Sequence, residues 1–179
     1  MKKIFWSCCA SVLFIITFMS FSSTQASAKN YQAVDRNLKS VTLETKHTSK
    51  GYEFALKYPG KAKKTLSTTF KNKPPYRAKV TIARNAKQPT LIICLLENEN
   101  TGWPYVDRIY AIKNGKLTKV QVKGNVGNVL ISYKSNNTLN TMYYNRFKNI
   151  KYTYTSKYNR TSNVLKTIKT IAQENAIGY

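Results

Sequence analysis

Acidic residues, histidine and cysteine are all scarce in this sequence, and each shortage excludes a class of chemistry. The 179 residues contain seven Asp and Glu, one histidine and three cysteines, against 30 Lys and Arg. Cys8 and Cys9 lie in the apolar stretch at the N-terminus, which leaves Cys94 alone in the rest of the chain. No disulfide can form within that part, and no spacing of His, Cys and carboxylate residues fits a zinc site.

The single histidine limits acid–base and nucleophilic catalysis. His47 lies in the polar stretch 46–49 without a nucleophile motif, and we expect it to be a solvent-exposed turn residue. Cys94 lies in the apolar run 91–96, where we expect a buried small hydrophobe and not a nucleophile. We therefore predict no catalytic residue, no metal site and no cofactor.

Long apolar runs are missing after the first 28 residues. Lys2 and Lys3 precede a mostly apolar stretch that ends at Phe21, and Ala26-Ser27-Ala28 fits the small-residue rule for signal peptidase. Residues 1–28 are thus predicted to be a cleaved signal peptide, with an uncleaved membrane anchor as the alternative. The remainder is expected to be secreted and extracellular, without an integral membrane segment. Secretion without disulfides is typical of proteins from bacteria of the Gram-positive type.

Strand signals recur at short intervals through the rest of the chain. Alternating or β-branched segments are separated by turn residues, with strands expected at 41–45, 52–58, 66–70, 76–83, 90–96, 108–113, 116–122, 129–133, 139–144 and 149–155. The continuously apolar run 90–96 predicts a strand that is buried on both faces. Asn114-Gly115 fits the type I′ turn of a β-hairpin.

The two ends of this region give different signals. Residues 29–40 are polar and are predicted to be a lead-in segment. Near the C-terminus, apolar side chains recur at helical spacing and predict an amphipathic helix over residues 162–174. The predicted fold is mainly β, as an antiparallel meander, sandwich or blade-like sheet of about nine or ten short strands with one C-terminal amphipathic helix. Residues 41–179 are expected to form a single domain.

Part of this pattern has a counterpart in a known family. The segments Val80–Asn85, Pro89–Ile93 and Ile109–Leu117, read as VTIARN, PTLII and IYAIKNGKL, resemble the FG-GAP-type β repeat of secreted Firmicute proteins over residues 76–125. The resemblance implies a β-meander architecture. In that family an Asp-rich turn that binds calcium precedes the second segment, whereas residues 82–88 here contain no carboxylate. The resemblance therefore implies the architecture without the metal.

Positive charge dominates the chain, with a formal net charge of +23. No Asp or Glu occurs in residues 54–93 or 108–173. Such a field attracts anionic polymers, although lysine-rich surfaces can also serve only for solubility. We expect an anionic cell-wall polymer or glycan as the partner, with non-specific binding of nucleic acid as a further possibility.

A first candidate site lies in residues 97–107, which are expected to form a long loop after the most apolar strand. Its candidate ligand-binding residues are Trp103, Tyr105, Glu97, Glu99 and Asp107. An aromatic ring can stack on a sugar while carboxylates bind the hydroxyl groups, and the same carboxylates could bind calcium or act as a glycosidase pair. The alternative is a loop whose acids neutralise nearby lysines and whose tryptophan covers the edge of the core.

A second candidate site combines tyrosines with cations. Its candidate polyanion-binding residues are Lys148, Lys151, Lys157, Arg146, Arg160, Tyr152 and Tyr154. Aromatic and cationic side chains on strands can form a groove for a single-stranded nucleic acid or an anionic glycan. The alternative is that the tyrosines are ordinary half-buried strand residues.

These patterns together predict a secreted, strongly basic, non-enzymatic protein that associates electrostatically with an anionic envelope polymer or glycan. One alternative is a cationic secreted effector, either antibacterial or directed at a host. Another is a glycan hydrolase that uses the carboxylates of the 97–107 segment.

Overall fold

The computed structural model describes residues 27–85, 88–134 and 138–174, and these residues form strands and turns without a helix. The predicted mainly β, antiparallel fold class is therefore confirmed. The signal peptide predicted for residues 1–28 lies almost wholly outside the described residues. Within the described part, no helix has the length and hydropathy needed to cross a bilayer.

The described residues contain thirteen strands where nine or ten were expected. In chain order they are β1 (Ala28–Val34), β2 (Ser40–Thr48), β3 (Gly51–Lys57), β4 (Lys64–Lys71), β5 (Tyr76–Asn85), β6 (Gln88–Asn98), β7 (Pro104–Lys113), β8 (Lys116–Lys119), β9 (Gln121–Lys123), β10 (Val129–Lys134), β11 (Thr138–Asn145), β12 (Ile150–Asn159) and β13 (Val164–Glu174). The predicted hairpin at Asn114-Gly115 joins β7 to β8, and both residues have the positive φ angles that a type I′ turn requires.

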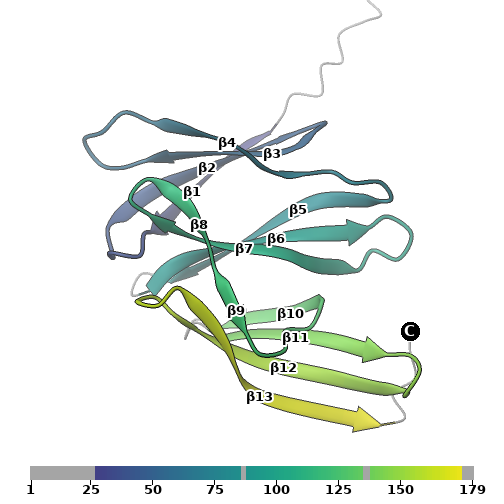
Figure 1. Cartoon of the computed structure of the whole chain (residues 1–179). Coiled ribbons are helices and arrows are strands. Elements are labelled where there is room, and N and C mark those ends of the chain that lie inside the picture. Colours follow the sequence, from purple (N-terminus) through teal and green to yellow (C-terminus); the bar gives the residue numbers. More distant parts are fainter. Residues whose placement is uncertain (1–26, 86–87, 135–137, 175–179) are drawn as a thin grey trace, which may run out of the picture.

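The strands form two sheets. Sheet A has the order β1-β2-β3-β4, and sheet B has the order β5-β6-β7-β10-β11-β12-β13-β9 with β8 paired to β7. Neighbouring strands pair antiparallel, except that β9 runs parallel to β13. Figure 1 shows three layers: sheet A lies above β5–β7, and β10–β13 curl round to form the third layer below them.

The central strand β6 explains why residues 90–96 are apolar without interruption. Ile92 and Cys94 face sheet A and belong to a core that includes Leu43 and Phe54. Leu91 and Ile93 face the other way, into a second core shared with β11, β12 and β13. Because alternate side chains of a strand point to opposite faces, a strand between two layers must be apolar at every position. The predicted burial on both faces is confirmed.

The segment predicted as a polar lead-in, residues 29–40, instead supplies strand β1 and the turn into β2. Residues 28–34 pair along their full length with β2. Ala33 is buried in the first core, and Tyr31 packs against that core. The alternation of these residues with polar ones is the strand signal that the overall polarity of the segment obscured.

The helix predicted over residues 162–174 is wrong, because residues 164–174 form strand β13. This strand pairs with β12 from Asn159↔Val164 to Ile150↔Glu174. Short apolar patterns fit both periods, and β-branched residues (Val164, Thr167, Ile168, Thr170, Ile171) favour strands. The backbone pairing with β12 therefore determines that the segment is a strand and not a helix.

Sheet B has one covered and one uncovered part on its outer face. Over β5–β7 this face packs against sheet A, with Ala78, Ile92 and Ile112 in the shared core. The opposite, inner face curls over the second core, where Leu139 and Leu165 are fully buried. Over β12 and β13 the outer face carries exposed or half-buried lysines instead of core residues.

Candidate functional site

Residues 97–107, predicted as a long loop, form mainly strand, with a turn of five residues between β6 and β7. The Asn98 side chain fixes this turn, because its Oδ1 accepts hydrogen bonds from the backbone N–H groups of Asn100 (2.8 Å) and Thr101 (3.2 Å). Gly102 supplies the positive φ of 68° that closes the turn. The backbone N–H of Asn98 then bonds to the carbonyl of Trp103 at 3.1 Å, which places the tryptophan at the end of the sheet.

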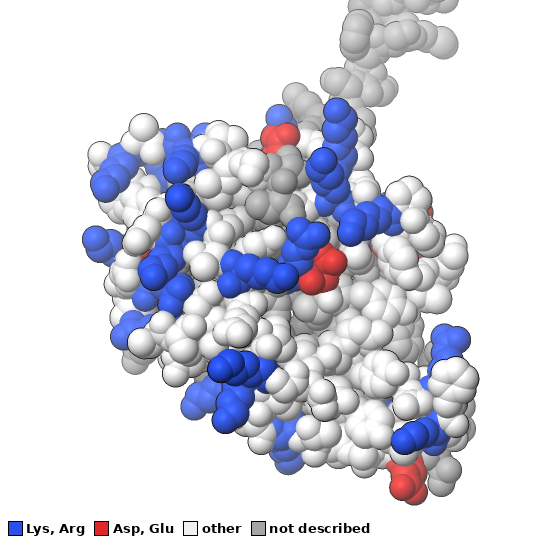
Figure 2. All heavy atoms as spheres, viewed as in Figure 1, with Lys and Arg blue, Asp and Glu red and all other residues white. Residues whose placement is uncertain are grey.

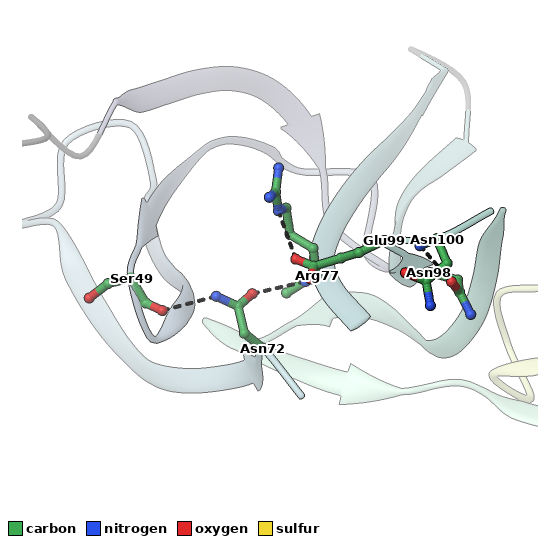
Figure 3. Close-up of polar contacts among 7 residues, drawn as sticks. Ser49, Asn72, Arg77, Asn98, Glu99 and Asn100 are labelled. Atoms are coloured by element: carbon green, nitrogen blue, oxygen red, sulfur yellow. Dashed lines mark hydrogen bonds and ion pairs between the residues drawn. The ribbon is translucent and has the colours of Figure 1, made fainter. Parts of the chain in front are cut away.

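The three candidate carboxylates each contact a cation. Glu97 accepts a hydrogen bond from Lys79 Nζ at 2.8 Å. Glu99 lies 3.5 Å from Arg77 Nε, and Asp107 lies 2.9 Å from Arg108 Nε. Figure 3 shows Glu99 directed toward Arg77, next to the Asn98 turn. These contacts match the alternative in which the acids neutralise nearby basic side chains.

The two candidate aromatic residues line a cleft of about 460 Å³. Its lining combines the β6–β7 turn, the start of β10 and the end of β11, namely Thr101, Trp103, Tyr105, Asn128, Val129, Tyr144 and Arg146. None of the described residues that line this cleft is a carboxylate. The structure thus joins two residues of the first candidate site to Arg146 of the second.

Contacts around the cleft hold its aromatic walls. The Tyr144 hydroxyl donates to Asn149 Oδ1 at 2.6 Å, which fixes the ring against the turn that carries Arg146. The Tyr76 ring meets Tyr105 edge to face, with 6.1 Å between ring centroids. The backbone N–H of Val106 donates to the carbonyl of Asn128 at 2.7 Å, and this bond draws β7 and β10 together. The cleft is therefore built on strands and bonded turns.

The turn from β11 to β12 also presents an unusual hydrophobic residue. Phe147 is fully exposed, with a relative accessibility of 102%. Arg146 precedes it and Lys148, another candidate polyanion-binding residue, follows it. This tip therefore combines an apolar ring with two cations at the rim of the cleft.

The second candidate site does not form one groove, because β12 presents its tyrosines and its lysines on opposite faces. Tyr154 is buried, and Tyr152 stacks on it with a centroid distance of 6.2 Å. Burial and the neighbouring phenol of Tyr152 raise the pKa of Tyr154. Lys151 and Lys157 alternate with these tyrosines and lie on the outer face. Arg160 is exposed in the turn between β12 and β13.

Tyr144 was one of the tyrosines that the sequence places among cations, but neither it nor Asn128 was a candidate site residue, although both line the cleft. Tyr144 belongs to β11 and is the pairing partner of Lys151 on β12. The pairing of Val129 with Tyr105 and the hydrogen bond from Val106 to Asn128 bring this region to the start of β7. These contacts depend on the curl of sheet B and leave no local signal in the sequence.

The groups that could support catalysis are dispersed. His47 is half-buried on β2, not an exposed turn residue, and its ring lies 4.7 Å from that of Tyr52. Cys94 is fully buried, and this burial raises the pKa of its thiol to about 12. The described residues contain no group of three His, Cys, Asp or Glu side chains that could hold a metal ion.

A larger cleft, of about 860 Å³, lies where sheet A meets the β7–β8 hairpin. Its lining includes Lys39, Lys61 and Lys64 together with Tyr58 and Asp35. The Asp35 carboxylate is buried and accepts hydrogen bonds from two backbone N–H groups of its own turn and from the Tyr58 hydroxyl. This cleft has one aromatic wall residue and an internally bonded carboxylate, so it offers less for stacking than the first.

Comparison of the chain with protein-family models, with curated proteins and with solved structures gave no match. The resemblance of residues 76–125 to the FG-GAP-type repeat accordingly stays a prediction.

Proposed function

We propose that this protein is a secreted, non-enzymatic binding protein that associates with an anionic polymer of the bacterial envelope. The observation that carries the proposal is the cleft whose walls are Trp103, Tyr105 and Tyr144, with Arg146 as its charged residue. The binding partner would be a polymer of acidic groups that also bears sugar rings.

Each part of the cleft suits one part of such a ligand. An aromatic ring offers a flat apolar surface to the C–H face of a sugar, and three such rings line this cleft. The guanidinium of Arg146 pairs well with a phosphate or carboxylate, because its N–H groups form a planar fork. Asn128 and Thr101 supply polar groups for hydroxyls.

The surrounding charge favours the same class of ligand. Figure 2 shows basic side chains spread over the visible face, with only a few acidic ones among them. A net charge of +23 raises the local concentration of a polyanion and speeds encounter, most strongly at low ionic strength. The candidate carboxylates Glu97, Glu99 and Asp107 each form an ion pair and none of them lines the cleft, which supports binding in preference to hydrolysis.

The test compares two probes: poly(glycerol phosphate) with sugar substituents and the same polymer without them. The full chain should bind the substituted polymer more tightly, by isothermal titration calorimetry at moderate salt. Trp103→Ala should remove this preference and weaken binding of the substituted polymer about 10-fold, which corresponds to the loss of about 1.4 kcal/mol from one aromatic contact. Binding of the unsubstituted polymer should change little.

Two controls make the result specific. Tyr143→Ala removes a tyrosine that is 41% exposed and does not line the cleft, so it should keep the preference. Phe147→Ala tests the exposed tip, with anionic phospholipid vesicles as a third probe. Equal affinity of the native protein for both polymers, or vesicle binding that depends on Phe147 and exceeds polymer binding, would contradict the proposal.

A further inference from the structure

Three lysines lie side by side across three strands of the outer face of sheet B. Lys157 on β12 is the pairing partner of Lys166 on β13. Lys166 in turn is the parallel partner of Lys123 on β9. Partners in a sheet point to the same face, so the three side chains form a row that runs across the strands, which we call the lysine row.

Hydrogen bonds to its neighbours hold the short strand β9 in this position. The backbone N–H of Gln121 donates to the carbonyl of Asn163 at 3.0 Å. The Thr167 hydroxyl donates to the carbonyl of Asn125 at 2.6 Å, just beyond the other end of β9. Lys123 is therefore fixed beside Lys166 from both sides.

The lysine row lacks nearby acidic residues. All three side chains are exposed. The described ion pairs involve Lys63, Arg77, Lys79 and Arg108, all outside the row. Residues 108–173 contain no Asp or Glu, and Glu174 pairs with Ile150 at the far end of β12. The charges of the row thus face solvent, and within the described residues neither an ion pair nor a carboxylate of strands β8–β12 neutralises them.

This arrangement is unfavourable for the free protein. Like charges directly opposite each other in neighbouring strands destabilise a sheet, and strands are spaced about 4.8 Å apart. An anion with closely spaced charges would replace each repulsion between neighbouring lysines with an attraction to the anion. A polysaccharide with one charge on every second sugar fits this short spacing less well than a chain of phosphates does.

We propose that the lysine row binds consecutive phosphate groups of a linear polymer that lies across β12, β13 and β9. This proposal deepens the proposed function and rests on it, since it names the chemical group that the basic surface recognises. It assigns the phosphates to the row and leaves the sugar to the cleft.

The row and the cleft share one continuous face. Tyr144, which lines the cleft, pairs with Lys151, and Lys157 lies on the same face of β12. The two lysines are about 20 Å apart along the strand, at about 3.3 Å per residue. Lys169 lies between them on β13, opposite Thr155. One polymer chain can therefore reach both sites, with further cations along the way.

The experiment uses inorganic polyphosphate, which has no sugar and so does not depend on the cleft. The triple variant Lys123→Gln, Lys157→Gln and Lys166→Gln should bind it at least 10-fold more weakly at 50 mM salt. The slope of log K against log salt should become shallower by about 2, because each lost phosphate contact on a flexible polyanion removes roughly 0.7. Trp103→Ala should leave polyphosphate binding unchanged.

A matched control removes the same charge elsewhere. Lys57, Lys71 and Lys119 are exposed, and none of them pairs with another lysine. If Lys57→Gln, Lys71→Gln and Lys119→Gln together weaken binding as much as the row variant, the row is not a site and only net charge matters. Tighter binding of hyaluronan than of polyphosphate would also overturn the proposal. If the native protein bound both poly(glycerol phosphate) polymers equally, the cleft proposal would fail, but the effect of the row variant on polyphosphate binding would still stand.

Discussion

The placement of Lys166 between two other lysines leads to an unusual expectation, namely that one substitution raises stability while it weakens binding. Lys166→Glu would convert two repulsive cross-strand contacts, with Lys157 and Lys123, into attractive ones. Opposite-charge pairs on neighbouring strands contribute roughly 0.2–1 kcal/mol each. The free energy of unfolding should therefore rise by about 1 kcal/mol, which corresponds to an increase in Tm of about 2–4 °C for a domain of this size.

Urea and thermal unfolding at low and high salt would measure this effect. The gain should shrink in molar salt, where the Debye length falls to about 3 Å. Lys119→Glu makes the same change in charge at an exposed residue whose partner is Tyr110, and it should change stability less. If Lys166→Glu is no more stable than Lys119→Glu at low salt, the three side chains are not neighbours and the lysine row does not exist. Polyphosphate binding by the same variant should fall, regardless of its stability.

Two further predictions concern buried groups. Burial raises the thiol pKa of Cys94 from 9.0 to about 12, so the contribution of the neutral thiol to stability should be complete below pH 9 and lost as the pH rises from 9 to 12. In urea unfolding over that interval, the free energy of unfolding of Cys94→Ala should fall less steeply with pH than that of the native protein. A native thiol that reacts with DTNB at pH 8 as fast as free cysteine would refute the burial. Asp35→Ala removes a buried carboxylate that accepts three hydrogen bonds and should lower the free energy of unfolding by about 3 kcal/mol, with Asp35→Asn intermediate, whereas equal stability of all three proteins would contradict this role.

Local signals in the sequence were sufficient for much of the strand pattern. Residues 90–96 are apolar at every position because β6 separates two cores, and that composition is visible without knowledge of the partners. The Asn114-Gly115 turn was equally predictable, because only a few residue pairs adopt two positive φ angles at low cost.

The C-terminal strand could not be distinguished from a helix in the same way. Leu165, Ile168 and Ile171 fit a helical stripe, yet they lie in a strand because β12 offers a long antiparallel partner. The cleft was hidden for a similar reason. Trp103 and Tyr144 meet only through the contact of β7 with β10, and a long-range contact of this kind has no local spacing rule.

Because β9 pairs in parallel with β13, the alignment of Lys123 with Lys166 depends on the presence of β13. Lys123 precedes β10, β11 and β12 in sequence, but it gains its neighbour only when Lys166 pairs with β9. A partly synthesised or C-terminally clipped chain would carry nearly the same net charge and yet lack the ordered alignment of its cations. Binding through the lysine row would thus require that β13 has folded onto β9, whereas binding through net charge alone would not.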